Sequence, residues 1–495
     1  MPDEHTATAP TAPPAGTPSR RVVLISAAGA VGGFLFGFDT AVINGAVDPI
    51  EKNFALDSVT LGTVVAVTLL GAAVGALLAG WLADRIGRTR VMGVAALLFA
   101  ASSVGCGTAS SLWDLTVWRL LTGVAVGFAT VLGPLYISEI APASARGRLS
   151  SLQQMAIVLG IFAALLSDSL IAALLGGADA DLFLGLPAWR WMFIAGTVPA
   201  LVYGIVSLRI PESPRYLASR GRREEAVRVL AGLHGVPHGQ AEHAVARMDA
   251  TVLHERRPRF RDLLSRRTGL LPIVWVGIGI AALQALVGID VIFYYSTSLW
   301  KSVGFGESAS FGLSVLSSLI NVLATVAAIA LIDRVGRRRL LLSGSIGMAA
   351  SLLMVSLGFS QAVTAGEELT LPGIWGPLTL VAANAFVVSF AVSWGPVVWV
   401  LLGEMFPNSI RGVALALAAS VNWISGVGVN LSFPSLREMS LPGGYALYAV
   451  MAVLSWLLVH FGVRETTNRE LEDMSGAPAP QDSRPDRAPL PPPLP

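Results

Sequence analysis

The sequence has little charge. Only 13% of its 495 residues are charged, 54% are hydrophobic, and the mean hydropathy is +0.66. A soluble globular protein carries about 25% charged residues, so a soluble chain of this composition would have too little polar surface to face water. These values predict an integral membrane protein. The net charge of +2 is too small to favour a nucleic acid as a partner.

Cysteine is nearly absent as well. The one cysteine, Cys106, lies in an apolar run, which excludes a disulfide framework, a cysteine zinc site and a CxxC redox centre. The basic residues are almost all arginine, with Lys52 and Lys301 as the only lysines. The sequence contains no phosphate-binding loop, metal-ligand cluster or nucleophile–base pair. It therefore predicts neither an enzyme nor an ATP-driven pump, and no metal or other cofactor.

Long apolar runs dominate what is there. A spanning helix needs roughly 20 apolar residues, and we count twelve such stretches, which lie near 22–44, 59–83, 91–109, 113–137, 151–175, 189–210, 271–297, 309–332, 340–360, 374–402, 412–434 and 443–463. We expect an all-α integral membrane protein with a tail at 1–20, a six-helix bundle at 21–210, a helical linker at 211–270, a second bundle at 271–464 and a Pro-rich tail at 465–495. Both tails have the composition of disordered segments, and no cleavable signal peptide is visible.

The loops between the stretches alternate in charge. Basic loops follow the second, fourth and eighth stretches, whereas the loops after the first, fifth and ninth are acidic or poor in arginine. In the linker, Val227, Leu230 and Leu233 have the spacing of one apolar helix face. By the positive-inside rule, the basic loops, the linker and both termini face the cytoplasm. The sequence thus predicts a multi-pass protein of the cell membrane in contact with lipid.

The loops also repeat. Residues 84–88 (DRIGR) return as 333–337 (DRVGR), 249 residues later, and residues 139–147 (EIAPASARG) correspond to 404–412 (EMFPNSIRG), 265 residues later. Two copies of a six-span unit explain this spacing. Such pseudosymmetric halves rock around a site at the membrane midplane to give alternating access.

These motifs resemble those of the major facilitator superfamily, and further strings resemble its sugar porter family. They are 211–215 (PESPR), 189–192 (WRWM), 37–43 (GFDTAVI) and 393–396 (SWGP) continuing to Trp399. The resemblance covers about 21–470 and is strongest to bacterial proton-coupled monosaccharide symporters. It implies transport of a sugar by alternating access, with protons as the coupled ion.

Two residues of opposite charge, Asp39 and Arg119, are among the charged residues inside the predicted spans. Asp39 is in the first and Arg119 in the fourth, and charges within a membrane are functional hypotheses by default. A carboxylate in a low dielectric can take up and release a proton near neutral pH, and an approaching arginine keeps it ionised. We interpret the pair as a proton switch; the alternative is a structural ion pair. The resemblance adds that an Asp here distinguishes proton symporters from facilitators.

A second set of charges belongs to the repeated loops. Ion pairs between the two halves would hold the cytoplasmic side closed and break when it opens; the alternative is that the arginines only set topology and contact lipid phosphates. The predicted gate consists of Asp84, Arg88, Glu139, Arg146, Asp333, Arg337, Glu404 and Arg411.

A sugar needs amides that donate and accept hydrogen bonds together with aromatic rings. The resemblance places sugar contacts at Phe36, Gln154, Gln284, Asp290, Tyr294, Tyr295, Asn321, Gly395, Trp399 and Asn422. Gln284 and Asn321 could each instead be helix-packing amides. Gln153 is expected to face elsewhere, since adjacent helical residues point about 100° apart.

The chain departs from the family pattern in the seventh span. Residues 284–290 read QALVGID where the family has QQxxGIN, so Ala285 replaces an amide and Asp290 an asparagine. Asp168 in the fifth span is a further acid where an amide is expected. Asp290 is thus a substrate contact, a second protonation site or a protonated stand-in for asparagine. The alternative function is a proton-coupled antiporter that exports a polyol, a glycoside or an amine-bearing compound.

Overall fold

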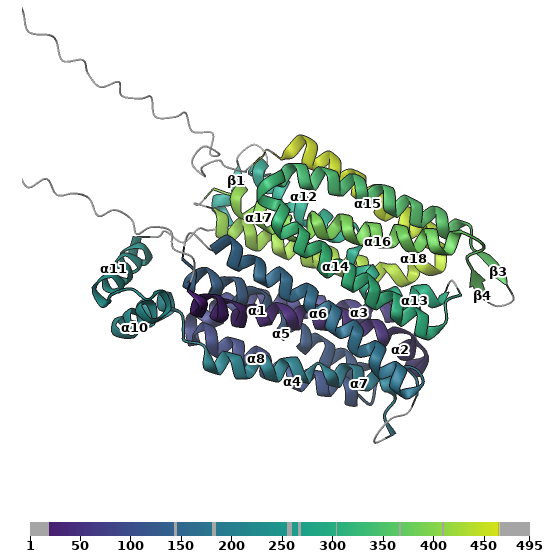
Figure 1. Ribbon diagram of the computed structural model, residues 1–495, viewed down its shortest axis with the longest axis horizontal. Helices are drawn as coiled ribbons and strands as arrows, with labels where there is room; N and C mark the ends of the chain where they lie inside the picture. Colours follow the sequence, from purple (N-terminus) through teal and green to yellow (C-terminus); the bar gives the residue numbers. More distant parts are fainter. Residues whose placement is uncertain are drawn as a thin grey trace, which may run out of the picture.

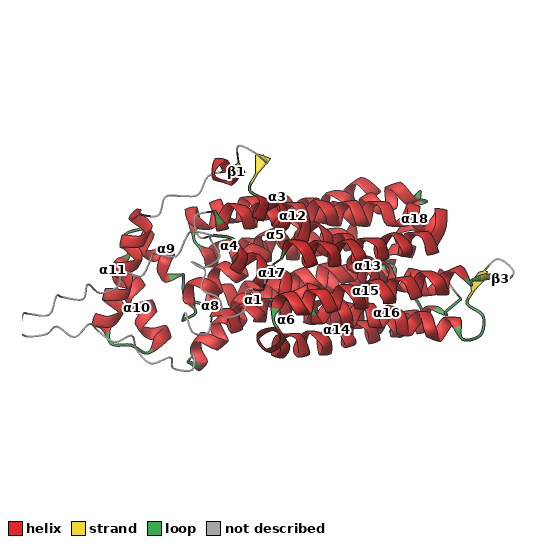
Figure 2. Cartoon of the chain, turned by 90° about the horizontal axis from the view of Figure 1, so that it is seen from above, coloured by secondary structure: helices red, strands yellow, loops and turns green. Residues whose placement is uncertain are grey.

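The structure is a computed structural model that describes residues 19–142, 146–180, 185–254, 260–265, 269–302, 304–365, 368–407, 410–463 and 465. Most of the helices run along one common axis and form a long bundle, with a small helical group at one end and a β-hairpin at the other (Figures 1 and 2). We call these the linker end and the hairpin end. The tails were predicted at 1–20 and 465–495, and of these the residues 1–18 and 466–495 lie outside the described residues.

The described residues of the N-terminal half form eight helices and one 3₁₀ turn. They are α1 (Arg20–Val42), η1 (Ile43–Gly45), α2 (Val47–Phe54), α3 (Ser58–Ile86), α4 (Arg88–Thr108), α5 (Leu112–Ile140), α6 (Arg146–Leu175), α7 (Ala188–Ala195) and α8 (Thr197–Arg209). Helices α7 and α8 form one apolar segment that is interrupted at Gly196.

The group at the linker end consists of α9 (Pro214–Ser219), α10 (Arg223–His234) and α11 (His238–His254), followed by η4 (Phe260–Leu263) and the strands β1 (Leu264–Ser265) and β2 (Gly269–Leu270). Val227, Leu230 and Leu233 of α10 are buried, as their spacing predicted. Ser19, just before α1, donates a hydrogen bond of 2.9 Å to the carbonyl of Leu233 and so ties α10 to the start of the bundle.

The C-terminal half contains α12 (Pro272–Leu286), α13 (Ile289–Ser302), α14 (Glu307–Val335), α15 (Arg337–Ser360), β3 (Val363–Ala365), β4 (Glu368–Thr370), α16 (Trp375–Val392), α17 (Trp394–Met405) and α18 (Arg411–Gly462). Strands β3 and β4 pair antiparallel and make the hairpin. Helix α18 is two helices that meet at Ser440, whose backbone is extended (φ −170°, ψ 102°) two residues before Pro442.

Eleven segments of the described chain are long and apolar enough to cross a membrane, and the last of them is α18. Dividing α18 at Ser440 gives twelve, the predicted number. The sides of the bundle are apolar: Leu174, Leu208 and Phe461 each expose more than 80% of their surface. A helix makes its backbone hydrogen bonds internally, and a helix that is apolar on every face presents only hydrophobic side chains to its surroundings. Both properties suit a segment in contact with lipid.

Three of the predicted spans are not continuous helices. The structure interrupts 189–210 at Gly196, 271–297 at 287–288 and 374–402 at Ser393. Gly288 adopts φ +80°, a conformation that favours glycine. Hydropathy alone did not predict these breaks, because a short interruption leaves the average along the segment unchanged.

Candidate functional site

The first component of the candidate site is a buried ion pair in the N-terminal half. Asp39 on α1 and Arg119 on α5 are 4% and 0% exposed, and Arg119 Nη1 lies 3.3 Å from Asp39 Oδ1. The two residues are 80 positions apart in the chain. The sequence predicted both residues, and the packing of α1 against α5 brings them together.

Arg119 has few other partners. Its guanidinium lies 5.7 Å from the centre of the Phe193 ring, while Nε and Nη2 have no hydrogen-bond partner among the described residues. A small cavity beside Asp39 is lined in part by Ser103, Cys106 and Thr122. Because its only described anionic partner is one carboxylate, the arginine depends on Asp39 for its charge compensation.

The second component is an amide cluster in the C-terminal half. Gln284 Nε2 on α12 donates to the carbonyl of Trp394 at 2.8 Å, and Asn422 Nδ2 on α18 donates to Gln284 Oε1 at 3.2 Å. Asn422 also donates to the carbonyl of Ala281 at 2.8 Å. Gln284 lies against the break between α16 and α17, so the interrupted backbone orients the amide.

The N-terminal half reaches this cluster through α6. A Cβ added to Gly395 would lie 3.7 Å from Gln154 Nε2, so the amide of one half faces the backbone of the other. Trp399 follows Gly395 by one helical turn and therefore lies on the same side of α17; its side chain is 38% exposed. Gln153 points elsewhere, as predicted, because its amide lies against Gly33 and Gly133 in the N-terminal half.

Asp290 lies next to the break between α12 and α13. A Cβ on Gly426 of α18 would be 3.6 Å from Asp290 Oδ2. Asn422, Gly426 and Asn430 follow one another at four-residue spacing along α18, so Asp290 faces the same side of this helix as the amide cluster. No described ion pair involves Asp290.

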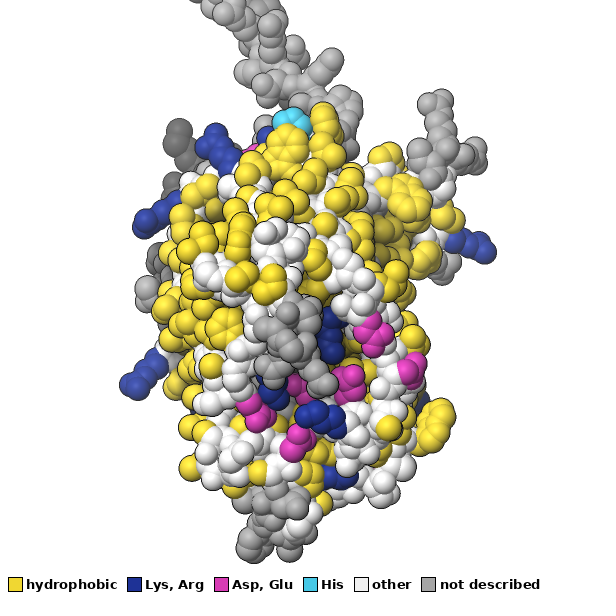
Figure 3. Space-filling model, turned by 90° about the vertical axis from the view of Figure 1, so that its right-hand side faces the viewer, with side chains coloured by type: hydrophobic (Ala, Val, Ile, Leu, Met, Phe, Trp, Pro, Cys, Tyr) yellow, Lys and Arg dark blue, Asp and Glu magenta, His cyan; other side chains and the backbone are white. Residues whose placement is uncertain are grey.

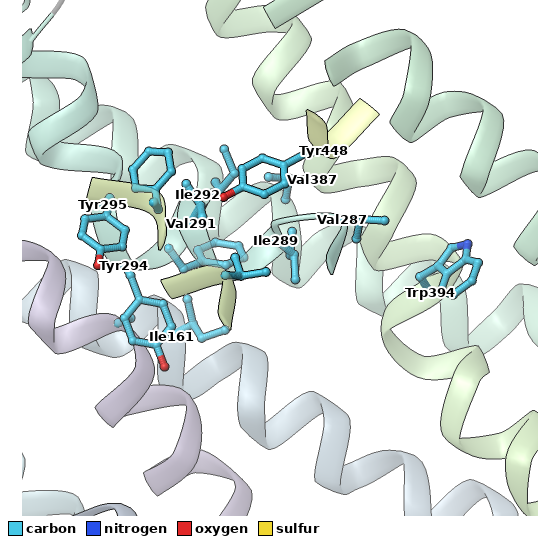
Figure 4. Close-up of a cluster of buried hydrophobic side chains, with 14 of the residues drawn as sticks. Ile161, Val287, Ile289, Val291, Ile292, Tyr294, Tyr295, Val387, Trp394 and Tyr448 are labelled. Atoms are coloured by element: carbon cyan, nitrogen blue, oxygen red, sulfur yellow. The ribbon is translucent and has the colours of Figure 1, made fainter. Parts of the chain in front are cut away.

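The predicted aromatic contacts lie in two different places, one between the halves and one inside the C-terminal half. Phe36 of α1 meets Trp423 of α18 edge to face at 5.5 Å, a contact between the halves. Tyr295 donates to the carbonyl of Asn430 at 3.1 Å and packs on Phe433, so it belongs to the core of the C-terminal half. Figure 4 shows Tyr294 and Tyr295 in an apolar cluster that also contains Ile161 of α6.

Asn321 on α14 is 5% exposed. Among the described residues no hydrogen bond joins it to Gln284 or Asn422. The structure therefore brings Gln154, Gln284, Gly395 and Asn422 into one cluster and leaves Tyr295 and Asn321 outside its hydrogen bonds.

At the linker end, the predicted gate residues of the N-terminal half form a network within that half. Arg88 Nε donates to Glu139 Oε2 at 3.1 Å, and Arg88 Nη2 lies 3.0 Å from Asp84 Oδ1. The side chains of Arg88 and Glu139 are 7% and 4% exposed. The side chain of Arg146 lies outside the described residues.

The C-terminal half repeats this arrangement. Arg337 Nη2 donates to Glu404 Oε1 at 3.0 Å, and Arg411 Nε donates to the carbonyl of Phe406 at 3.2 Å. The side chain of Asp333 lies outside the described residues. The described pairs hold each half together at this end, and pairing between the halves stays a prediction.

Two acids in these networks had no assigned role at the sequence level. Glu212 accepts hydrogen bonds from the backbone N–H groups of Arg88 and Thr89 at 3.0 and 3.3 Å, at the start of α4. Glu465 accepts from Arg337 and Arg338 at 3.0 and 3.2 Å, at the start of α15. A carboxylate is favourable at a helix N-terminus. Their separation of 253 residues, close to the loop repeat, was the signal that could have paired them.

The hairpin end is closed by contacts between the halves. Lys301 Nζ of α13 lies 3.2 Å from Asp48 Oδ2 of α2, and Arg437 Nη2 of α18 lies 3.9 Å from Glu51 Oε2. Burial raises the pKa of Glu51 from its ordinary value, while Arg437 opposes that rise. Figure 3 shows acidic and basic side chains gathered on this face. These ion pairs were not predicted, because the residues that they join do not belong to the repeated motifs.

A neutral contact accompanies these ion pairs. Asn44 in η1 donates from Nδ2 to Ser296 Oγ at 2.9 Å and accepts from the backbone N–H of Thr297 at 2.9 Å, so η1 is fastened to α13 of the other half.

Comparison with known proteins agrees with this geometry. Residues 25–477 match the family described as "Sugar (and other) transporter". The chain is 50% identical over 455 residues to the "Glucose transport protein" of Synechocystis sp., which covers 92% of this chain and 97% of the relative. It is 33% identical over 491 residues to the D-xylose-proton symporter of Escherichia coli strain K12, covering 92% and 95%.

Solved structures of sugar transporters also match this chain. The proton:xylose symporter XylE, a major facilitator superfamily protein bound to 6-bromo-6-deoxy-D-glucose, matches with a TM-score of 0.76 and 32% identity over 92% of this chain and 99% of that one. An inward open conformation of the E. coli xylose transporter XylE matches with a TM-score of 0.77 and 31% identity, with the same coverage. This chain belongs to the sugar transporter family of the major facilitator superfamily.

Proposed function

We propose that this protein is a secondary active transporter that carries a monosaccharide together with protons by alternating access. The observation that carries the proposal is the buried Asp39–Arg119 pair in one half, combined with an amide cluster that both halves contribute to. The relatives named as a glucose transport protein and a D-xylose-proton symporter support the same substrate and ion.

The ion pair is the proposed proton switch. With Arg119 3.3 Å away, the negative charge of the ionised Asp39 carboxylate is compensated by the guanidinium. When α5 withdraws the arginine, the acid lies in a low dielectric without a counter-charge and takes up a proton. Proton binding is thereby linked to the relative position of two helices, which is what coupling to alternating access requires.

The proposed sugar site is the amide cluster. Gln154, Gln284 and Asn422 donate and accept hydrogen bonds, the break at 393–395 exposes backbone carbonyls, and Trp399 presents an aromatic face. Asp290 and Phe36 border the cluster from α13 and α1. We further propose Tyr294, Tyr295 and Asn321 as residues that reach substrate when the halves rearrange.

We place the linker end in the cytoplasm. Arginines are concentrated there, in the loops that follow α3 and α14 and in α9–α11, as the positive-inside rule requires. Both termini then lie on the cytoplasmic side of the cell membrane, and lipid covers the apolar sides of the bundle. In the opposite state of the cycle, the charged residues of the linker end pair between the halves and close it.

Uptake into proteoliposomes tests the proposal. Labelled glucose and xylose are added to vesicles with an inward proton gradient, without a gradient, and with the gradient collapsed by a protonophore. We expect accumulation above the external concentration only with the gradient intact. Equal internal and external sugar under all three conditions contradicts proton coupling, and no saturable uptake of either sugar contradicts sugar transport.

Asp290 favours a second candidate, the export of a polyol, a glycoside or an amine-bearing compound by proton antiport. An acid next to the amide cluster suits a cationic or hydroxyl-rich substrate. The double substitution Ala285→Gln and Asp290→Asn restores the family pattern. If the departures narrow the choice of substrate, the double variant gains binding of ordinary hexoses. If its substrate range and pH profile equal those of the parent, the departures carry no functional information.

A further inference from the structure

Asp168, on α6, is a buried acid that forms no ion pair with any of the described residues. It is 0% exposed, and neither carboxyl oxygen makes a hydrogen bond of ordinary geometry to a described residue, although the backbone N–H of Gly45 approaches the carboxyl group. An ionised carboxylate in such a place loses its hydration without compensation, at an effective cost of several kcal/mol. The arrangement therefore favours the neutral, protonated acid.

The neighbours of Asp168 belong to the junction between the halves. A Cβ added to Gly45 of η1 would lie 3.0 Å from Asp168 Oδ2 and 2.6 Å from Met192 Sδ. The residue before Gly45 is Asn44, which is fastened to Ser296 and Thr297 of α13. The acid thus packs directly behind the turn that closes the hairpin end.

The charged groups on the surrounding elements are already engaged. At this level of the bundle they are Asp39 on α1, Arg119 on α5, Arg190 on α7 and Glu307 on α14. Asp39 pairs with Arg119, Arg190 donates to the carbonyl of Gly107 at 3.2 Å, and Glu307 pairs with Lys301 at 3.2 Å. Asp114, in the first turn of α5, accepts a hydrogen bond from the backbone N–H of Ser110 at 3.0 Å. The remaining charges on α1, α5, α14 and α17 lie toward the linker end.

We propose that Asp168 is a second proton-binding site, separate from Asp39, and that its proton holds the hairpin end closed. Ionisation requires water at the carboxylate. Because η1 covers the acid, water arrives only if η1 moves and the bonds of Asn44 to α13 break. A proton bound at Asp168 therefore favours the closed hairpin end, and its loss at higher pH favours opening.

This proton is not carried across the membrane. Asp168 lies seven residues before the end of α6 at the hairpin end, about 10 Å along the helix axis, and η1 is the element that shields it. The proton enters and leaves on the hairpin side, so Asp168 senses the pH of that compartment. The inference rests on the alternating access proposed above, but it does not require Asp39 to be the coupling acid.

Distances between spin labels on the two halves test the inference in the full chain, reconstituted in lipid nanodiscs. Labels are attached at Asn53→Cys on α2 and Met439→Cys on α18, both exposed positions at the hairpin end. The buried Cys106 is replaced by serine, and Asp39→Asn removes the first proton site. We expect the long-distance population to grow as the pH is raised from about 5 to about 9.

The decisive comparison adds Asp168→Asn, which has the shape of the protonated acid but cannot ionise. We expect this variant to lose the pH dependence and to stay at the short distance. Asp179→Asn, an exposed acid at the same end, is the control and keeps the dependence. A pH dependence that persists in Asp168→Asn overturns the inference, as does a parent protein whose distances do not change with pH.

A second measurement covers the case in which Asp168→Asn does not fold. We expect infrared spectra of the parent to contain the C=O stretch of a buried, protonated carboxyl group, and we expect Asp168→Glu to shift that band. A band unchanged in Asp168→Glu overturns the inference. Failure of gradient-driven sugar uptake in the parent, by contrast, tests the proposed function and leaves the spin-label result intact.

Discussion

The two halves share a fold but divide the chemistry. Each carries one acid two residues after a glycine in its first predicted span, Asp39 in the N-terminal half and Asp290 in the C-terminal half, 251 residues apart. Asp39 faces Arg119. Glu139 and Glu404 are equivalent positions 265 residues apart. By the same spacing, the position equivalent to Arg119 in the C-terminal half is Asn384, which is neutral. The N-terminal half thus has a charge pair suited to protons, while the C-terminal half supplies most of the amides suited to a sugar.

The two ends of the bundle differ in a related way. The linker end repeats one network in each half, with an arginine, a glutamate and a capping acid, so the sequence repeat is visible there. At the hairpin end, Lys301 and Arg437 join the halves and have no repeated counterpart. Contacts within a half are duplicated with the fold, whereas contacts between halves arise where the two copies meet.

The largest expected effect tests whether the coupled proton binds in the N-terminal half alone. Asp39→Asn removes the titratable acid beside Arg119, so we expect complete loss of sugar accumulation driven by a pH gradient, while exchange of sugar between the two sides continues. Transport in proteoliposomes measures both. Asp290→Asn is the matched change in the other half and should still accumulate sugar. Loss of accumulation in both variants would mean that both halves bind the coupled proton.

The next effect compares the two linker-end networks. Arg88→Ala leaves Glu139, whose side chain is 4% exposed, without its cation, and breaking such a buried pair costs about 3–5 kcal/mol. Arg337→Ala affects Glu404, which is 33% exposed and so can recover hydration. Thermal unfolding in detergent should show the larger loss for Arg88→Ala. Equal losses would indicate that the two networks are energetically equivalent despite their different burial.

A smaller effect concerns the sugar site between the halves. Gln154→Ala and Trp399→Ala each remove one proposed contact, and a lost neutral hydrogen bond is worth about 0.5–1.5 kcal/mol. We expect sugar Kd to rise by about 2–10-fold in each variant, measured by calorimetry. Gln153→Ala, whose amide points away, should keep the parent affinity. Unchanged binding in the first two variants would place the sugar elsewhere.

The smallest expected effect comes from a comparison of the chain's two lysines. Lys301 pairs across the halves at 26% exposure, whereas Lys52 pairs with Asp179 within the N-terminal half at 69% exposure. Partly exposed pairs contribute at most about 1 kcal/mol, so Lys301→Met should shift the hairpin end toward opening by up to about 5-fold. Spin labels at Asn53→Cys and Met439→Cys report the shift. Lys52→Met should leave the distances unchanged, and an equal shift in both would argue against the cross-half pairing.

Much of the architecture was predictable from the sequence. The all-α membrane fold, the number of spans and the family are confirmed, because hydropathy adds up along a segment and the repeated loops keep their spacing. Asp39 and Arg119 were also found in this way, since a charge in an apolar run is conspicuous. The helix breaks at Gly196, Gly288 and Ser393 were missed because one or two residues hardly change an average.

What the sequence determined by itself was local: which segments are apolar enough for lipid, which loops carry arginine, and that the chain holds two copies of one unit. Only the tertiary structure decided which side chains meet. It paired Asp39 with Arg119 across 80 residues, set Glu212 on the start of α4, and left Asp168 behind η1 without an ion pair to any described residue. The reason is that burial in lipid depends on composition along one helix, whereas each contact depends on the rotation and crossing of two helices, which the packing of the whole bundle fixes.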